Sequence, residues 1–298
     1  MKKLFSFLLA LVLLLSLFAC SDEPPAPNDG GDTAPAPQAN PATDFEYTVM
    51  RQPDCISITK YVGTSKSVVF PETINGLPVV IISWHPADVG EMHSFIESIV
   101  IPDTVETIED GAFSDCKSLV SVDFGAGVRS IGESAFKNCT ALQKIILPPK
   151  LETIGADAFY NCSSATEIFV PKTVKAWGRD DSRGTFAGCT ALKTLTFEDG
   201  LEQIGYWATF SGAESLESIE IPASVKKIAP LCFNACPSLK TVVFHGDAPE
   251  ATLASGSNVQ YVFDYTNANE DLVIYYDPAT NGWDTVAWRE VHRLEPTV

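Results

Sequence analysis

A pattern of about 23 residues recurs six times through the middle of this chain. In each copy a Phe is followed three residues later by a Cys and, after three more, by a Leu, with Ala replacing one Cys and one Leu. The steps between successive Phe residues are 23, 23, 27, 24 and 23. A fixed period of this length is typical of stacked supersecondary units. The copies are Phe113, Cys116, Leu119; Phe136, Cys139, Leu142; Phe159, Cys162, Ala165; Phe186, Cys189, Leu192; Phe210, Ala213, Leu216; and Phe233, Cys236, Leu239.

One copy of the pattern cannot fold alone. In residues 142–148 the apolar residues Ile145 and Leu147 alternate with the period of a strand. Val128 and Ile131 line the return side. About six buried apolar side chains do not offset the entropy of ordering 23 residues. Neighbouring copies must therefore share one core and pair their strands.

The pattern resembles the BspA-type leucine-rich repeat, also called the Treponema pallidum type, from about residue 61 onward. The resemblance implies a leucine-rich-repeat solenoid that is mainly β, with short irregular or helical turns. It also implies a parallel sheet on one face and caps at both ends. Some members of the family bind fibronectin or fibrinogen and mediate adhesion. The resemblance therefore indicates a class of function and no particular ligand.

Both ends of the array have the composition of caps. Ile99 lies 23 residues before Val122, but Gly90 and His93 stand where Phe and Cys are expected. This is a degenerate first repeat. Near the C-terminus an apolar run at 272–276 is followed by tryptophans, and aromatic rings of this kind can cover an open core end.

The first twenty residues have the layout of a secretory signal. Lys2 and Lys3 precede an apolar run that is short for a membrane span. Residues 17–20, Leu-Phe-Ala-Cys, resemble the lipobox of bacterial lipoproteins, which implies lipidation of Cys20 and cleavage before it. An uncleaved helical anchor is the alternative. Residues 21–43 contain six Pro and no aromatic residue, which predicts an extended tether.

The short acidic run at 22–23 resembles the surface-export signal of Bacteroidota lipoproteins. We therefore expect an outer-membrane lipoprotein that is exposed at the cell surface, with a periplasm-facing one as the alternative. The expected parts of the chain are a signal peptide at 1–19, a lipidated Cys and disordered tether at 20–43, an N-terminal cap and degenerate repeat at 44–104, six repeats at 105–247, and a C-terminal cap at 248–298.

The balance of charged residues restricts the classes of partner that the chain is expected to bind. The chain has 20 Lys and Arg against 38 Asp and Glu, a formal charge of -18. A surface this acidic repels phosphate backbones, so nucleic acid is not an expected partner. It also disfavours docking on anionic lipid, so the membrane is expected to be contacted only through the lipid anchor.

No sequence motif indicates catalysis, a cofactor or a metal site. None of the four His lies in a zinc motif, and neither a nucleophile elbow nor a phosphate-binding loop occurs. The repeated Cys is interpreted as a small apolar core residue, because Ala213 replaces it once and packing allows this while ligation does not. Asp180 and Asp181 supply too few ligands for calcium. We therefore expect a protein that is not an enzyme.

The outward positions of the sheet and two insertions supply candidates for binding. Exposed apolar residues in strands also have a plain explanation in β-propensity, and a longer loop is cheap. Insertions in solenoids nevertheless often map to one functional face. The candidates are the apolar pair Ile146 and Phe169, the cross-strand pair Lys144 and Glu167, the four-residue insertion with Arg179, Asp180, Asp181 and Arg183, and Tyr206 and Trp207 beside the one-residue insertion.

Together these features predict a lipid-anchored cell-surface repeat protein that acts as a binding or adhesion module. Its partner would be an extracellular protein, from a host matrix or another cell surface, or a glycan. One alternative is a structural spacer, at the surface or in the periplasm, without a specific ligand. Another is an accessory protein for carbohydrate capture.

The anchor is testable by one substitution. Cys20→Ala removes the thiol that lipidation requires, so we expect a chain that is neither lipidated nor cut before residue 20. Metabolic labelling with a fatty acid measures this. Labelling that persists in the variant would contradict the anchor.

Overall fold

The computed structural model describes residues 37–83, 95–178, 183–251, 262–263, 271–284 and 293–297. These residues, apart from Pro37, belong to one compact unit, Gln38–Val298. Within the described ranges no helix is both long enough and apolar enough to cross a membrane. The helix η1, Ala42–Asp44, is a single 3-10 turn, and the other regular elements described here are strands.

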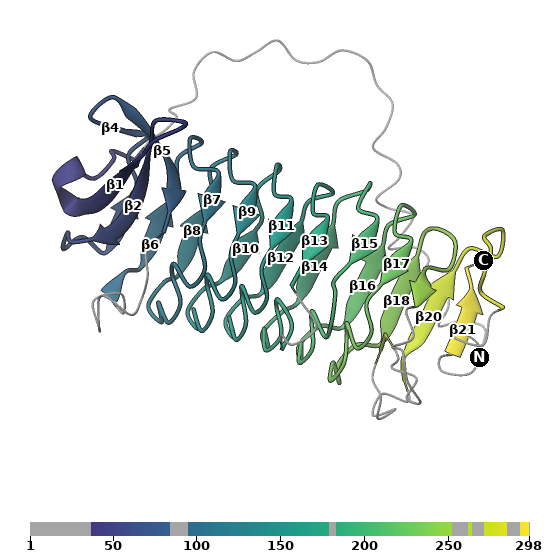
Figure 1. Ribbon diagram of the computed structural model, residues 1–298. Helices are drawn as coiled ribbons and strands as arrows, with labels where there is room; N and C mark the ends of the chain where they lie inside the picture. Colours follow the sequence, from purple (N-terminus) through teal and green to yellow (C-terminus); the bar gives the residue numbers. More distant parts are fainter. Residues whose placement is uncertain are drawn as a thin grey trace, which may run out of the picture. The chain divides into compact units, whose positions relative to one another are not determined.

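The unit is a solenoid whose coils follow one another in chain order (Figure 1). One strand from each coil contributes to a parallel ladder, here called the first ladder, and its outward and inward residues alternate. In β10, for example, Ile145 is fully buried whereas Ile146 is 45% exposed. The strands of the first ladder are β3 Ser67–Val69, β6 Ser98–Val100, β8 Ser121–Asp123, β10 Lys144–Ile146, β12 Glu167–Val170, β14 Thr194–Phe197, β16 Ser218–Ile221, β18 Thr241–Phe244, β20 Val273–Tyr276 and β21 Arg293–Pro296.

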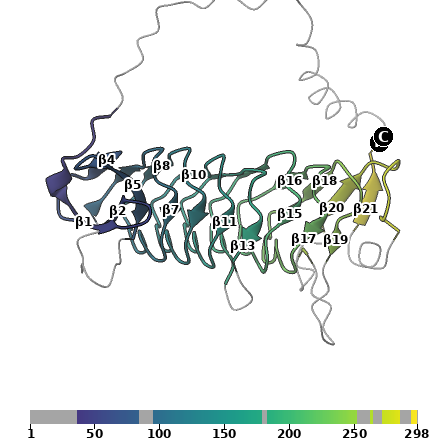
Figure 2. The same ribbon diagram turned by 45° about the horizontal axis from the view of Figure 1, so that its top comes forward.

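The return side of each coil forms a second parallel ladder, and the predicted irregular turns follow its strands, as at residues 133–138. Its strands arise because the same short segment recurs at a fixed offset, so that Thr107 pairs with Ser130 and Ser130 with Thr153. Figure 2 shows these strands along a different side of the coils from the first ladder. They are β5 Leu77–Ile82, β7 Thr107–Ile108, β9 Ser130–Ile131, β11 Thr153–Ile154, β13 Ala176–Trp177, β15 Gln203–Ile204, β17 Lys227–Ile228 and β19 Glu250–Ala251.

Stacked phenylalanine rings run through the core between the ladders. Phe136 and Phe159 lie 5.1 Å apart with an interplanar angle of 3°, and Phe186 and Phe210 lie 5.2 Å apart at 1°. The stack continues past the last predicted repeat to Phe263, whose ring centroid is 5.5 Å from that of Phe233. Repeating Phe thus sets the spacing of the coils, which is close to the distance between neighbouring strands.

The repeated cysteines are buried and reduced, as the packing interpretation predicts, but they also donate hydrogen bonds. The Sγ of Cys139 lies 3.2 Å from the carbonyl oxygen of Phe113, one coil earlier. Cys162 makes the same contact with Phe136 at 3.3 Å. The thiols of Cys139 and Cys162 therefore join consecutive coils, and Ala213 cannot form this bond.

A column of charged residues with alternating sign runs along the outer side of the second ladder. Backbone hydrogen bonds place Arg129 beside Glu106 and Glu152, and Lys226 beside Glu202 and Glu250. Two pairs of neighbouring residues in this column form ion pairs: Arg129 with Glu152 at 2.8 Å, and Lys226 with Glu202 at 2.7 Å. In chain order the column reads Glu106, Arg129, Glu152, Lys175, Glu202, Lys226, Glu250.

An antiparallel hairpin begins the folded unit. Its strands, β1 Phe45–Met50 and β2 Cys55–Tyr61, pair with each other, and β2 continues in parallel into β5. The short β4, Thr73–Ile74, pairs with β5. Ser98 pairs with Ser121 and Ile99 with Val122, which confirms the register of the degenerate repeat. Gly90 and His93 lie outside the described residues.

The folded unit begins earlier than the predicted end of the tether. Residues 38–43 are part of it. The backbone N–H of Asn40 donates to the carbonyl of Val69 at 2.9 Å, and Asn40 Oδ1 accepts from the N–H of Val69 at 2.8 Å. This exchange satisfies backbone groups of β3, which explains why a Pro-rich segment is ordered here.

At the C-terminal end, β20 and β21 extend the first ladder. Trp283 is buried against Phe244 and Tyr276, with ring centroids 4.9 and 5.1 Å away. Its indole N–H donates to Thr280 at 2.9 Å. This agrees with the aromatic closing segment predicted for the cap, although Trp288 lies outside the described residues.

Because of its buried thiols, the free energy of unfolding of the protein is expected to fall as the pH becomes alkaline. Burial raises the pKa of Cys116 to about 12 from an ordinary 9.0. Between these values the unfolded chain releases a proton that the folded chain retains, so the free energy of unfolding falls as pH rises. The slope is about 1.4 kcal/mol per pH unit for each thiol. Urea unfolding of the reduced protein from pH 8 to 11 should therefore decline less steeply for Cys116→Ala than for the parent. Equal slopes would contradict this.

Candidate functional site

The predicted sheet patch lies on the outer face of the first ladder. Ile146 pairs with Phe169, and Lys144 with Glu167, in the register between β10 and β12. The ammonium of Lys144 lies 2.7 Å from the Glu167 carboxylate, so this cross-strand pair is confirmed as a contact. Ile146 is exposed and Phe169 is half-buried.

The predicted rim residues lie in another part of the coil, after strands of the second ladder. Arg183 is exposed, and its guanidinium is 5.2 Å from the centre of the Tyr160 ring. The backbone N–H of Arg183 donates a hydrogen bond to the carboxylate of Asp157. Tyr206 is 43% exposed and Trp207 is half-buried. Arg179, Asp180 and Asp181 lie outside the described residues. The sheet patch and the rim thus belong to different ladders.

The ladders are interrupted at three places among the described strands. The first ladder lacks pairing between β8 and β10 and again between β14 and β16. The second ladder lacks it between β13 and β15. The coil that contains β14 and β15 therefore pairs with the preceding coil through one ladder and with the following coil through the other.

An aromatic residue precedes both interruptions of the first ladder. Phe124 directly follows β8 and Phe197 ends β14, at a position that is aliphatic in the coils that follow them. The ring of Phe124 packs edge-on against Phe136, and that of Phe197 against Phe210, with centroids 5.5 and 5.8 Å apart. Each ring thus contacts the phenylalanine of the next coil at the point where pairing to the next strand stops, whereas Phe244 packs on Trp283 and its strand still pairs with β20. The residues at this position are Phe124, Leu147, Val170, Phe197, Ile221 and Phe244.

An aromatic residue also precedes the interruption of the second ladder. Trp177 occupies the place of Ile131, Ile154 and Ile204 in neighbouring coils. It is 3% exposed. Its indole N–H is buried without a hydrogen-bond partner among the described residues. A large ring in an aliphatic position thus precedes the interruption between β13 and β15, where the longer 27-residue step also lies.

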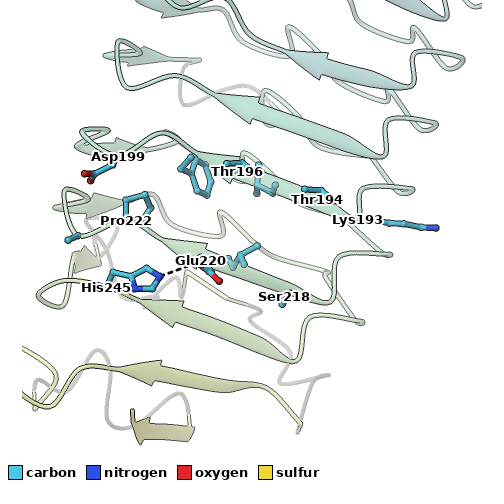
Figure 3. Close-up of a pocket in the computed structure, with 12 residues that line it drawn as sticks. Lys193, Thr194, Thr196, Asp199, Ser218, Glu220, Pro222 and His245 are labelled. Atoms are coloured by element: carbon cyan, nitrogen blue, oxygen red, sulfur yellow. Dashed lines mark hydrogen bonds and ion pairs between the residues drawn. The ribbon is translucent and has the colours of Figure 1, made fainter. Parts of the chain in front are cut away.

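An open cavity of about 570 Å³ occupies the interruption between β14 and β16. It reaches the core, because Leu195 and Phe197 each keep 6% exposure whereas Ile145 and Ile168 have none. Figure 3 shows side chains of both strands and of the segment after β18 around it. Its lining residues are Lys193, Thr194, Leu195, Thr196, Phe197, Asp199, Ser218, Ile219, Glu220, Pro222, Ala223 and His245.

The charged groups of the cavity are not evenly spread. His245 Nε2 lies 3.1 Å from the carboxylate of Glu220. Asp199 lies on the same side, and Lys193 extends away from this group (Figure 3). An apolar floor with hydroxyl groups and carboxylates on its walls suits the binding of a polar group that has an apolar stem.

None of the predicted binding residues lines this cavity. The sequence signal that could have located it is the aromatic residue at the end of residues 194–197, together with the 24-residue step that follows. In the ranges that the structure describes, no group of three or more His, Cys, Asp or Glu side chains is placed to hold a metal ion.

The family model of the BspA type leucine rich repeat region matches residues 92–180 and 182–267, with six copies. These matches cover more than half of the chain. The chain belongs to the BspA-type leucine-rich-repeat family. No curated protein is significantly similar to it.

Three solved structures share the fold. The leucine-rich-repeat protein TpLRR of T. pallidum is 27% identical over 76% of this chain and 86% of its own, with a TM-score of 0.51. A leucine-rich-repeat protein from Bacteroides ovatus is 22% identical over 85% of this chain and 66% of its own, with a TM-score of 0.57. A leucine rich cell surface protein from Faecalibacterium prausnitzii is 25% identical over 70% and 55%, with a TM-score of 0.50.

The interpretation that the Phe197 ring holds β14 and β16 apart predicts the effect of removing it. Phe197→Leu places at this position the residue type that follows β10, where Leu147 stands, so β14 and β16 should approach and pair. Amide protons of residues 218–221 should then exchange with solvent more slowly. Phe244→Leu is the control, because Phe244 packs on Trp283 and its strand already pairs with β20. Unchanged exchange in Phe197→Leu would show that the ring is not the cause.

Proposed function

We propose that this protein is a non-catalytic binding module of the cell surface, and that the cavity between β14 and β16 contributes to the contact with its partner. One observation carries this proposal. At the interruption between β14 and β16 the sheet face opens into a cavity that combines an apolar floor with hydroxyl, carboxylate and imidazole groups.

The family and the fold support a binding role. Leucine-rich-repeat proteins generally mediate protein–protein interactions, and one similar structure is that of a protein described as a cell surface protein. The two ladders and the phenylalanine stack hold the cavity on strands, which suits recognition by a preformed surface. The signal-like start with Cys20 supports anchoring by lipid, and the acidic run after it supports export to the outer surface.

A spacer without a specific ligand is the second candidate. The alternating charges of the second ladder favour it, because neighbouring side chains satisfy one another in ion pairs at 2.7 and 2.8 Å. Because its charges are already paired with each other, the outer side of the second ladder offers little to attract other proteins non-specifically. A spacer would have no use for the cavity, so the two candidates differ in one measurement.

A binding array of extracellular matrix proteins and glycans, probed with the full chain, separates them. We expect a partner whose binding falls at least about tenfold in Ser218→Trp, because an indole on the wall fills the cavity. Ser121→Trp is the matched control, since Ser121 holds the same outward position in β8, away from the cavity. Its binding should equal that of the parent.

Three other results would contradict the proposal. An array without any partner favours the spacer. Equal binding by Ser218→Trp and the parent removes the cavity from the contact. If the double variant Tyr206→Ala, Trp207→Ala then loses binding, the contact lies on the rim.

A further inference from the structure

The cavity between β14 and β16 has a preferred charge. Its two carboxylates, Asp199 and Glu220, lie on the same side as the imidazole of His245 (Figure 3). Lys193 is the cation among the lining residues, and it points away from them. The nearby Lys172 is engaged with Glu198 at 2.7 Å. The side of the cavity opposite Lys193 therefore presents negative charge to a ligand.

The strand edges that face the cavity add hydrogen-bond donors and acceptors. β14 pairs with β12, and β16 pairs with β18, but β14 and β16 do not pair with each other. Backbone carbonyl groups and N–H groups on the two facing edges therefore both lack a ladder partner across the gap. The hydroxyl groups of Thr196 and Ser218 lie on the same walls. These backbone and hydroxyl groups include both donors and acceptors, so the two carboxylates determine which charge of ligand the cavity prefers.

The floor of the cavity is apolar, which limits the shape of such a ligand. Leu195 and Ile219 come from the two strands, and Phe197 lies beside them. A cation on a hydrocarbon stem can cover this floor with its methylene groups while its charged end reaches the carboxylates. A guanidinium offers five donors in one plane and can bind a carboxylate through two parallel hydrogen bonds.

We propose that this cavity takes an arginine side chain from a protein partner. The proposal rests on the proposed function, because it names the group that the cavity would bind. Glu220, which lies 3.1 Å from His245 Nε2, pairs with the guanidinium, and Asp199 adds a second carboxylate. The formal charge of -18 draws a basic surface toward the protein, and this attraction weakens with salt.

A capped peptide with a single arginine, acetyl-Gly-Arg-Gly-amide, isolates the interaction. The Glu220 side chain is 76% exposed, so solvent screens the pair and one arginine should bind weakly, with a Kd on the order of 1 mM at low salt. In the ¹⁵N-labelled full chain, the peptide should shift amide signals of residues 194–199, 218–222 and 245. The same peptide with citrulline, which has the shape of arginine without its charge, should bind at least about tenfold more weakly.

Two variants locate the site. Glu220→Gln combined with Asp199→Asn should weaken arginine-peptide binding about tenfold or more. Asp123→Asn should leave binding unchanged, because Asp123 holds the outward position of Glu220 in β8 and does not line the cavity. Equal binding of the citrulline peptide, or signal shifts confined to other residues, would overturn the proposal without the need for any variant.

The peptide and the array test different statements. If the array finds a partner that Ser218→Trp loses, but the arginine peptide does not bind, the binding module stands and the arginine assignment fails. If the peptide binds in the cavity but no partner is found, the arginine subsite stands and the proposed function fails.

Discussion

Stacking of one aromatic ring on the next, coil after coil, is the interaction on which this structure depends. The rings from Phe113 to Phe263 lie 5.1–5.6 Å apart. This distance is close to the 4.7–4.9 Å between strands, so a single step along the stack advances both ladders by one strand. The stack remains continuous where the ladders are interrupted, as between Phe186 and Phe210. The phenylalanines thus keep the coils in order while the sheets are free to open.

An aromatic ring in a strand position, outside the phenylalanine stack, can accompany loss of strand pairing between coils. Phe197 at the end of β14 and Trp177 in β13 replace aliphatic residues, and each accompanies a loss of pairing to the next strand. Regular coils give a closed sheet face that has little to distinguish one partner from another. An out-of-place ring opens that face at one coil, and it does so on a rigid support. Departures from the repeat are therefore better guides to function in this fold than the repeat itself.

The sequence predicts the solenoid because a period of about 23 residues recurs over many coils and its apolar residues alternate. It also predicts which residues face outward, as Ile146 and the Lys144–Glu167 pair confirm. The second ladder could not be predicted from the sequence, because strands of two residues are too short to show an alternating pattern. The cavity could not be predicted either, for a different reason. Whether Phe197 turns into the core or displaces its neighbour depends on the ring of Phe210, which lies in the next coil.

The alternating charges on the second ladder have a consequence for how the chain chooses its neighbours. All coils share the same core residues, so the core alone cannot tell the correct neighbour from the one beyond it. Along the column from Glu106 to Glu250, however, every adjacent pair has opposite sign and every second residue has the same sign. A coil that skipped its neighbour and stacked one place further on would bring carboxylate against carboxylate or cation against cation, which destabilises a ladder. The acidic and basic residues thereby disfavour stacking that skips one coil, which is the smallest error a chain of similar coils can make.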